Sequence, residues 1–408
     1  MKEKYLINDI CDVGSSKRIY LSEYQDTGIP FYRGKEIIEK DSNKDISNEL
    51  FISQERYNEI KEKFGAPKVG DILMTAVGTI GVSWYVDESN FYFKDGNLIW
   101  FKNFKEDIIN SRYLYYIFKS KVFIEKIKNI SIGSTQKAIT IEQVKKIKLN
   151  LPEISIQNRI VKILDNIDNK IKLNNEINNN LYEFTNKLFD EKILNNEEKT
   201  NWKEYQLSDI SKMINGYSYK GKELAEQSKI GMVTIKNFDR TGGFKLDGFK
   251  NIIPEKCKND HYVKPFEVLV ACTDLTQNAD IIGNAIMLLN NLDYNEIVMS
   301  MDLVKLVPIT DLVNNYMLYS IVNSKDFKSF ALGYKSGTTV LHLNKNCFTE
   351  YTIKLPEKDL LLELSWVIEI NYKKISQIIE ENKRLEQLKD TLLPKLMNGE
   401  IDLDNIEI

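Results

Sequence analysis

The stretch LPEISIQNRIVKILDNIDNKIKLNNEINNNLYEFTNKL at residues 151–188 decides the fold, because its pattern recurs as LPEKDLLLELSWVIEINYKKISQIIEENKRLEQLKDTL at 355–392. Each copy starts with Leu-Pro-Glu and continues with apolar residues at helical spacing. The copies lie 204 residues apart and align without a gap over about 60 residues. Chance similarity would not preserve both a proline and a helical apolar stripe, so the chain contains an internal repeat.

Each copy predicts a long helix, roughly Ser155–Leu194 and Asp359–Met397, with Ser155 and Asp359 as N-caps. About 40 residues at a rise of about 1.5 Å make a rod of roughly 60 Å. The apolar positions follow the heptad spacing of helices that pack on one another. The residues predicted to pack the helices are Ile160, Leu164, Ile167, Ile171, Leu181, Leu188, Leu364, Ile368, Ile375, Leu385 and Leu392.

The middle of each stripe is polar. Asn174 and Asn178 interrupt the first stripe, and Asn382 is the repeat counterpart of Asn178. Buried asparagines can fix the register of paired helices at a cost in stability. The alternative is that these asparagines are solvent-exposed and reflect an AT-rich coding sequence, and the sequence leaves both interpretations open.

The segments before the helices repeat as well. Tyr5–Ile10 resembles Tyr205–Ile210, and Gly70–Met74 resembles Phe266–Val270, whereas the residues between such anchors diverge. Short strands are expected at Ile72–Met74, Val82–Val86, Leu98–Phe101, Val268–Ala271, Ile281–Leu289 and Leu303–Val307, and helices at Arg112–Asn129 and Asn315–Phe330. We predict an α+β fold with globular domains at 1–150 and 201–355, each followed by a helical segment, at 151–200 and 356–408.

Composition fits a soluble, cytoplasmic protein. Hydrophobic residues make up 42% of the 408 residues and charged residues 28%, with no secretory signal and no run of 18 apolar residues. The four cysteines form no C-x-x-C pair, which disfavours a zinc ribbon. The net charge of −3 argues against a strongly basic protein. However, residues 1–150 hold 24 Lys and Arg against 21 Asp and Glu, so a local basic face is still compatible with the sequence.

Loops that recur in both halves are the best candidates for a shared binding task. GSTQKAI at 133–139 matches GTTVLHL at 337–343, and TAVGTIG at 75–81 corresponds to the region of TDLTQN at 273–278. Glycine allows close backbone approach, and the polar side chains can contact phosphates or base edges. The alternative is an ordinary loop before a strand. The candidate DNA contacts are Arg33, Lys35, Thr75, Thr79, Ser134, Thr135, Gln136, Lys137, Lys220, Lys222, Lys236, Asn237, Thr273, Thr276, Gln277, Asn278, Thr338, Thr339 and His342.

The sequence contains no complete catalytic or metal-binding motif. Gly216–Lys222 satisfies G-x-x-x-x-G-K, but Glu223 stands where a phosphate-binding loop requires Ser or Thr. No Pro-Pro or Pro-Asp pair occurs, which disfavours the usual signatures of amino-group DNA methyltransferases and of restriction nucleases. His261 and His342 have no spaced partners for a metal site. We therefore predict no catalytic residue, no bound metal and no enzymatic activity.

Taken together, these features resemble the specificity subunit of type I restriction–modification systems. The resemblance rests on the two Leu-Pro-Glu leaders, the helical stretches QNRIVKILDNIDNKI and ENKRLEQLKDTLLPKLMNGEIDL, the GDIL segment at Gly70–Leu73 and the GSTQK loop. It covers nearly the whole chain. The chain departs from an ideal repeat at two places: Leu341 stands where the first copy has Lys137, and Ser365-Trp366 interrupts the apolar stripe of the second long helix.

The resemblance implies two target-recognition domains, each reading half of a bipartite site in double-stranded DNA. It implies that the helices pair antiparallel as a coiled-coil spacer, which gives the chain pseudo-two-fold symmetry. The implied partners are two methyltransferase subunits and restriction (translocase) subunits, and these would bind S-adenosylmethionine, ATP and Mg²⁺ while this chain binds no cofactor. Two other hypotheses stay open: an adaptor whose β domains bind protein, and an enzyme with an unrecognised site.

Overall fold

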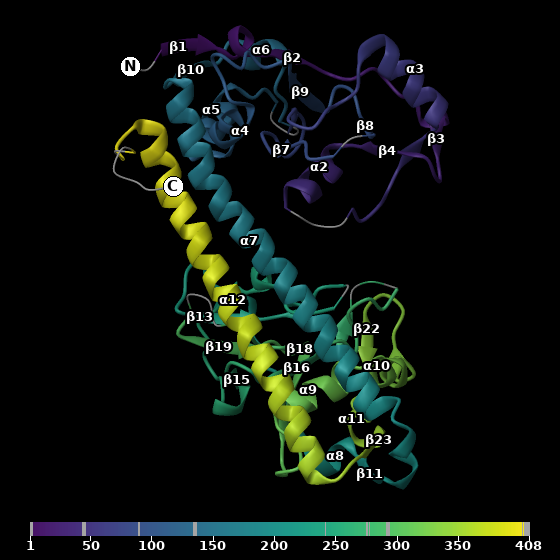
Figure 1. Cartoon of the computed structure of the whole chain (residues 1–408). Coiled ribbons are helices and arrows are strands. Elements are labelled where there is room, and N and C mark those ends of the chain that lie inside the picture. The colour runs from purple at the N-terminus through teal and green to yellow at the C-terminus, as the bar shows by residue number, and fades with distance from the viewer. Residues whose placement is uncertain are drawn as a thin grey trace. The chain divides into compact units, whose positions relative to one another are not determined.

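The computed structural model describes residues 3–42, 46–88, 90–133, 137–240, 242–274, 276, 278–290, 294–401 and 403 (Figure 1). The chain divides into two compact units. The first unit contains residues 1–170 and 385–408, and the second unit contains residues 171–384. Since both long helices cross these limits, each helix contributes one part to each unit.

The first unit is built around two four-stranded sheets and a two-stranded ladder. One sheet has the order β2 (Asp12–Gly14), β9 (Leu98–Lys102), β6 (Ile72–Thr75), β7 (Ser83–Tyr85). The other has the order β3 (Tyr24–Gln25), β5 (Phe51–Ile52), β4 (Ile29–Tyr32), β8 (Tyr92–Phe93), in which β4 and β8 are parallel. The ladder pairs β1 (Glu3–Leu6) with β10 (Lys148–Leu151). It joins the start of the globular segment to its end, directly before the long helix.

The second unit repeats one sheet and the ladder of the first unit, while its other four-stranded sheet has its parallel pair in the centre rather than at one edge. One sheet has the order β12 (Ser211–Asn215), β20 (Leu303–Pro308), β16 (Val268–Ala271), β18 (Ala285–Met287). The other has the order β14 (Lys250–Asn251), β13 (Ile230–Val233), β19 (Glu296–Met299), β15 (Tyr262–Val263). The ladder pairs β11 (Lys203–Gln206) with β23 (Thr352–Leu355). Leu6 lies opposite Lys148 and Gln206 opposite Thr352, so the two ladders pair equivalent positions, 200 residues apart in the first strands and 204 residues apart in the second strands.

The first unit has the short helices α1 (Ile7–Ile10), α2 (Gly34–Asp41), α3 (Gln54–Phe64), α4 (Ser111–Lys119), α5 (Lys121–Ile130) and α6 (Ile141–Lys145). The second has α8 (Leu207–Ile210), α9 (Asn315–Asn323), α10 (Lys325–Leu332) and α11 (Cys347–Glu350). Four short helices correspond between the units, α1, α4, α5 and α6 with α8, α9, α10 and α11, while α2 and α3 have no α-helical counterpart among the described residues.

The single helices expected at Arg112–Asn129 and Asn315–Phe330 are each broken in two. Ser120 ends α4 and caps α5, since its hydroxyl oxygen accepts a hydrogen bond from the Phe123 N–H at 3.3 Å. Ser324 does the same for α10 through Phe327, at 3.1 Å. A serine hydroxyl that satisfies the free N–H groups of a new helix permits a sharp turn, while the apolar periodicity continues across it.

The long helices are α7 (Ile154–Phe189) and α12 (Lys358–Asn398). After α7 the chain continues as a five-residue π-helical segment, Asp190–Leu194. The prediction of Ser155 and Asp359 as N-caps is wrong, because both residues lie inside the first turn. The carbonyl oxygens of Glu153 and Glu357 already accept the first helical hydrogen bonds, from Gln157 and Leu361.

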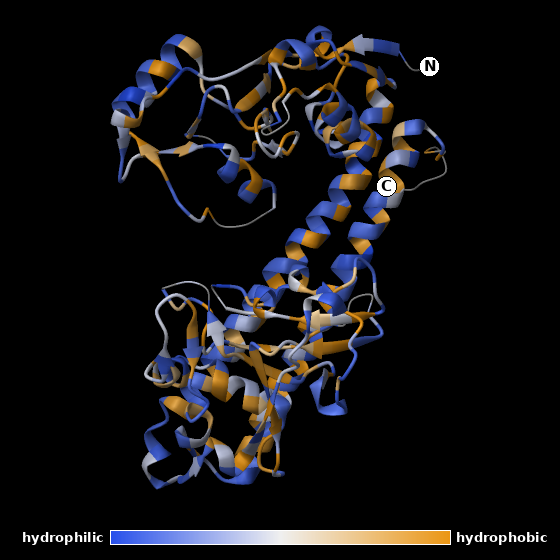
Figure 2. Ribbon diagram, turned by 180° about the vertical axis from the view of Figure 1, so that it is seen from behind, coloured by the Kyte–Doolittle hydropathy of each residue, from blue (hydrophilic) through white to orange (hydrophobic). Residues whose placement is uncertain are grey.

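In each unit the two helices pack antiparallel. In the first unit Asp168 of α7 pairs with Lys389 of α12. In the second unit the Asn371 amide of α12 donates to the Thr185 hydroxyl of α7 at 3.1 Å, while Asn174, earlier in α7, bonds Asn382, later in α12. Along both helices hydrophobic and hydrophilic positions alternate (Figure 2).

The residues predicted to pack the helices fall into two groups. Buried are Ile160, Leu164, Ile167, Leu364, Ile368 and Ile375. Half-buried are Ile171, Leu181, Leu188, Leu385 and Leu392. Ile160 and Leu164 also belong to the core of the first unit, and Leu364, Ile368 and Ile375 belong to the core of the second unit. The same apolar residues therefore pack against both the partner helix and a globular core.

The asparagines in the middle of the pair are buried, with Asn174 exposing 1% and Asn382 9% of their surface. The Asn174 amide donates to the Asn382 side-chain oxygen at 2.8 Å, and the Asn382 amide donates to Asn175 at 2.8 Å. This network supports the interpretation that Asn174 and Asn382 fix the register of the helices, and it contradicts the interpretation that they are solvent-exposed. Asn178 is buried as well, and its side-chain oxygen has no hydrogen-bond partner.

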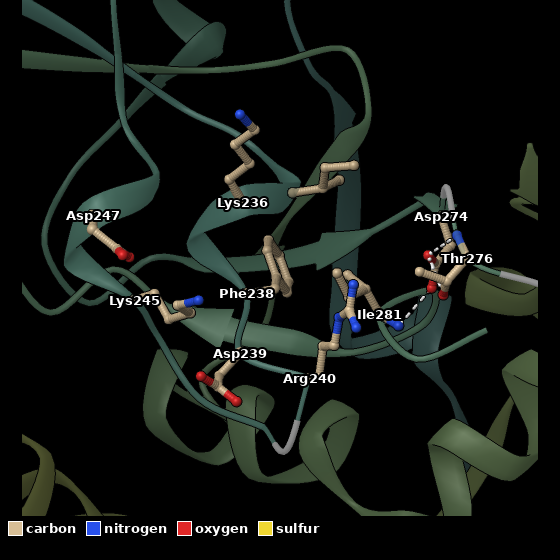
Figure 3. Close-up of a pocket in the computed structure, with 10 residues that line it drawn as sticks. Lys236, Phe238, Asp239, Arg240, Lys245, Asp247, Asp274, Thr276 and Ile281 are labelled. Carbon is tan, nitrogen blue, oxygen red and sulfur yellow. Dashed lines mark hydrogen bonds between the residues drawn. The ribbon is translucent and has the colours of Figure 1, made fainter. Parts of the chain in front are cut away.

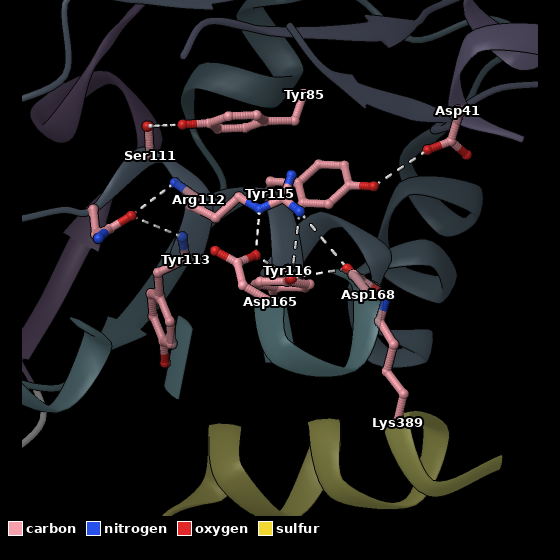
Figure 4. A network of polar contacts seen from close by, with 11 residues as sticks. Asp41, Tyr85, Ser111, Arg112, Tyr113, Tyr115, Tyr116, Asp165, Asp168 and Lys389 are labelled. Atoms are coloured by element: carbon pink, nitrogen blue, oxygen red, sulfur yellow. Dashed lines mark hydrogen bonds and ion pairs between the residues drawn. The ribbon is translucent and has the colours of Figure 1, made fainter. Parts of the chain in front are cut away.

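A charged network fastens the helix pair to the first unit (Figure 4). The Arg112 guanidinium of α4 donates from Nε to Asp165 of α7 at 2.7 Å. The Tyr116 hydroxyl donates to Asp165 at 2.5 Å and is 2.8 Å from Asp168, which in turn pairs with Lys389 of α12. Although burial alone would lower the pKa of Arg112, the neighbouring Tyr116 and Asp165 raise it above its ordinary value.

Candidate nucleic-acid interface

In the first unit the structure brings together the two loops that the sequence singled out. The Gly78 N–H donates to the Lys137 carbonyl oxygen at 3.0 Å, and the Ile139 N–H donates to the Ala76 carbonyl oxygen at 2.9 Å. Val77 and Ala138 form an antiparallel bridge between the loops. Lys137 is exposed beside this bridge. The candidates Ser134, Thr135 and Gln136 lie outside the described residues.

In the second unit the corresponding loops meet at the corresponding place. The strand β17 (Thr273–Asp274) pairs with β22 (Leu341–Leu343), which also pairs with β21 (Lys335–Ser336). Thr273 lies opposite His342, just as Val77 lies opposite Ala138. The exposed candidates here are Asn278, Thr338, Thr339 and His342, whereas Gln277 lies outside the described residues. The frame is therefore shared, while the side chains on it differ.

Thr75 shapes the first loop from inside. It is 1% exposed, its hydroxyl donates to the Thr79 carbonyl oxygen at 2.5 Å, and it accepts from the Val82 N–H at 3.0 Å. These bonds leave the Thr75 hydroxyl occupied within the protein. Thr79, at the tip, is exposed and available to a ligand.

Arg33 and Lys35 flank this loop at the start of α2. Between them, Gly34 lies against the Thr75 methyl group. The Arg33 guanidinium contacts the buried Glu36 carboxylate at 2.5 Å, so its charge is already paired. Burial would raise the pKa of Glu36, but the hydrogen bonds from Arg33 lower it below its ordinary value. Lys35 is exposed and only 3.8 Å from Glu39.

Lys236 and Thr276 of the second unit line one pocket of about 440 Å³ (Figure 3). Arg240 and Lys245 line it as well, and so do Asp239, Asp247 and Asp274, so the lining combines three cationic with three acidic side chains. Arg240 is exposed, with Asp280 at 3.9 Å. The sequence did not single out Arg240 or Lys245, although both lie in a short segment rich in cations that directly follows Lys236.

Asn237, in contrast, is a structural residue. It is completely buried; its amide donates to the Lys245 carbonyl oxygen at 2.9 Å, and its oxygen accepts from the Thr234 N–H at 2.9 Å. A DNA contact by Asn237 would require this side chain to leave both partners.

Asp274 holds the loop on the other side of the pocket. Its carboxylate is buried and accepts from the Thr276 N–H at 2.8 Å and from the Ile281 N–H at 2.6 Å. Burial would raise the pKa of Asp274, but these hydrogen bonds lower it below its ordinary value. The carboxylate thus fixes the position of Thr276, and Asp274 itself also lines the pocket.

Lys220 and Lys222 lie apart from this cluster in the contacts of the described residues. Lys220 precedes a three-residue turn, Gly221–Glu223, and Lys222 lies within it, where its ammonium pairs with Glu255 at 2.6 Å. The Tyr217 hydroxyl bonds Glu223 and lowers the pKa of that carboxyl to about 2. A phosphate-binding loop needs a full helix after the glycine-lysine pair, so the short turn agrees with rejecting that motif.

Metal binding and membrane insertion find no support in the described part of the chain. Within it, no three His, Cys, Asp or Glu side chains gather as a metal site requires. Its helices also lack the combination of length and apolar character needed to cross a bilayer.

Comparison with known proteins places this arrangement in a family. The family model described as "Type I restriction modification DNA specificity domain" matches residues 2–183 and again residues 199–390. The type I restriction enzyme MjaIX specificity subunit of Methanocaldococcus jannaschii is 24% identical, over 98% of this chain and 93% of that protein. A Haemophilus influenzae protein named "Putative type I restriction enzyme specificity subunit S.HindORF215P" is 34% identical, over 40% of this chain and 39% of that protein.

Among solved structures, the S subunit of a type I restriction–modification system from M. genitalium has a TM-score of 0.57 at 16% identity, with 97% of this chain and 96% of that chain covered. This likeness shows a shared fold. Because the family model matches twice and covers most of the chain, the chain belongs to the type I restriction–modification DNA specificity family and carries the specificity domain in two copies.

Proposed function

We propose that each unit reads one half of a bipartite site in double-stranded DNA and that the chain is not itself an enzyme. The observation that carries the proposal is the repeated loop junction, Val77 with Ala138 and Thr273 with His342. One backbone frame used twice with different side chains suits two half-sites of different sequence. Phosphate contacts would position each unit, and exposed polar side chains would read base edges.

The helix pair would set the distance between the half-sites. At about 1.5 Å per residue, the 36 residues of α7 span roughly 54 Å, which is on the order of one and a half turns of B-DNA. The Asn174–Asn382 hydrogen bond supports this role, because a fixed helix register keeps such a distance constant.

We further propose that the helices bind the methyltransferase subunits, which with the restriction subunits would hold S-adenosylmethionine, ATP and Mg²⁺. Large apolar side chains are exposed along both helices at spacings of four or seven residues. They are Leu173, Ile177 and Phe184 of α7 and Leu362, Trp366 and Ile370 of α12. Exposed apolar stripes of this kind mark surfaces that another protein covers. Trp366 interrupts the apolar stripe that packs the helices, and its side chain is 64% exposed. A role in contacting the partner protein would explain this position.

The partner surface is tested by Trp366→Lys in the full chain. We expect the variant to lose co-purification with a co-expressed methyltransferase subunit of its system, because a charge replaces an apolar contact. The matched control is Ile253→Lys, which changes a residue that is 62% exposed and lies outside the helices. Equal retention of the methyltransferase by both variants would contradict this assignment.

DNA reading is tested by sequencing the methylated positions in a host that carries the chain with its methyltransferase. We expect one motif made of two specified parts separated by an unspecified gap, and no such motif in a host without the chain. A continuous motif, or a motif that does not depend on the chain, would contradict the proposal.

A further inference from the structure

A second pocket, of about 560 Å³, lies in the first unit among α5, α6 and β10. It is lined by Lys126, Ile130, Gln143, Lys146, Ile147 and Lys148. Three of the six lining residues are lysines and none is acidic. All three lysines are exposed, and none of them forms an ion pair with a described residue. The Lys126 ammonium donates to the Lys148 carbonyl oxygen at 2.9 Å, which holds its charge at the pocket.

The surroundings add to this positive charge. Residues 121–150 contain seven lysines and two glutamates, in a chain whose net charge is −3. One of the two glutamates, Glu142, is already paired with Lys145 at 3.0 Å. The segment therefore offers several unpaired ammonium groups on a small area, which attracts anions.

The second unit carries other residues at the same place. The register of the ladders makes Thr352 the counterpart of Lys148, and at the same separation Glu350 replaces Lys146 and Phe330 replaces Lys126. The Phe330 ring packs 5.1 Å from Tyr334 and 5.3 Å from Tyr351, and the Tyr334 hydroxyl donates to Glu350 at 2.5 Å. The second unit thus forms the same elements with none of the three lysines, so these lysines are not a requirement of the fold.

We propose that the pocket of Lys126, Lys146 and Lys148 binds a backbone phosphate of DNA next to the half-site read by the first unit, an inference that rests on the proposed function. The pocket lies between α5 and α6, and the chain that joins these helices is the loop at 131–140, which meets the loop of Val77. DNA that contacts this loop brings its backbone to the lysines. Ammonium groups bind phosphate oxygens as point charges and carry no sequence information.

The test uses Lys126→Gln/Lys146→Gln/Lys148→Gln in the full chain, in complex with its methyltransferase. Fluorescence anisotropy gives the Kd for a duplex with the methylated motif and for a scrambled duplex over a range of salt concentrations. We expect weaker binding to both duplexes by the same factor. We also expect the slope of log Kd against log salt to fall by about 0.9, because the variant no longer neutralises the one phosphate that the pocket binds.

Two control variants make the result specific. Lys256→Gln/Lys258→Gln/Lys264→Gln removes the same charge from three exposed positions outside the pocket and outside the long helices, and should leave the slope unchanged. Lys126→Arg/Lys146→Arg/Lys148→Arg keeps the charge and should retain the wild-type slope.

The outcomes separate the two proposals. An unchanged slope with retained preference for the motif overturns the phosphate pocket and leaves the proposed function standing. Loss of methyltransferase from the glutamine variant, with an unchanged slope, also overturns the inference and assigns the lysines to an acidic surface of that protein. If the wild-type complex shows no preference for the motif, the proposed function itself fails.

Discussion

Single residues decide how the globular parts are held to the helices, and Arg112 is the clearest case. The sequence predicts a helix around Arg112 from its apolar neighbours, but not the partner Asp165, which lies 53 residues further along the chain. Arg112 also contacts an aromatic ring from a distant part of the sequence, since its guanidinium carbon lies 4.7 Å from the centre of the Tyr85 ring. Contacts of this kind depend on how elements pack, which periodicity alone does not specify.

We predict that Arg112→Met destabilises the full chain by about 1–3 kcal/mol, because the half-buried Asp165 loses its charge partner. The urea-induced unfolding transition of the first unit gives the change in the free energy of unfolding. The control is Arg18→Met, which removes a pair with Asp95 whose arginine side chain is 68% exposed. That change should cost less than about 1 kcal/mol. Equal effects of the two substitutions would contradict a special role for the Arg112 network.

Asp274 gives a prediction that depends on pH. Because its pKa is lower in the folded state, Asp274 contributes stability above the ordinary aspartate pKa of about 3.9, and this contribution is lost as the pH falls through its folded-state value. Asp274→Asn should therefore destabilise the second unit at neutral pH, and the difference from wild type should shrink below about pH 4. Thermal unfolding across this pH range tests it, with the exposed Asp260→Asn as control. A difference that stays constant down to low pH would rule out the carboxylate as its source.

At the scale of elements, the internal repeat carried most of the correct prediction. The paired Leu-Pro-Glu leaders placed both long helices, and the strands around Ile72, Leu98, Val268 and Leu303 follow from their apolar, β-branched content. The two-stranded ladders were not predicted, because strand pairing between distant segments is not visible in local patterns. The breaks at Ser120 and Ser324 were missed, because apolar spacing continues through them while one hydroxyl redirects the backbone. The same limit applies to the candidate site: recurrence singled out the loops, but neither their meeting nor the burial of Thr75 and Asn237 followed from it.

The helix pair is tested through its buried asparagines. Asn174→Leu alone should destabilise the second unit by about 1–3 kcal/mol, since the Asn382 amide group loses a buried hydrogen bond. In Asn174→Leu/Asn382→Leu we expect stability to return to the wild-type level or above it, because no buried polar partner is left over. Urea unfolding of both single variants and the double variant forms a double-mutant cycle. Additive losses would show that the two residues do not act as a pair.

At the scale of the whole molecule, the chain carries two copies of one specificity domain. The copies share the strand order of one sheet and the pairing of the ladders, and they differ in the exposed side chains at the loop junction, where Lys137 belongs to one copy and His342 to the other. These shared elements follow from the sequence repeat. A DNA target does not follow from it, because under the proposed function readout depends on side chains in the divergent segments and on how DNA fits them.

The most direct measurement is the methylated motif produced by a variant altered in the second unit alone. Lys236→Gln/Thr276→Ala/His342→Ala changes side chains at its pocket and loop junction and none in the first unit. Methylome sequencing should show that one half of the motif becomes relaxed or weakly modified, while the other half and the gap stay as in the wild type. A motif that changes in both halves together, or in neither half while methylation continues, would contradict the division of recognition between the two units.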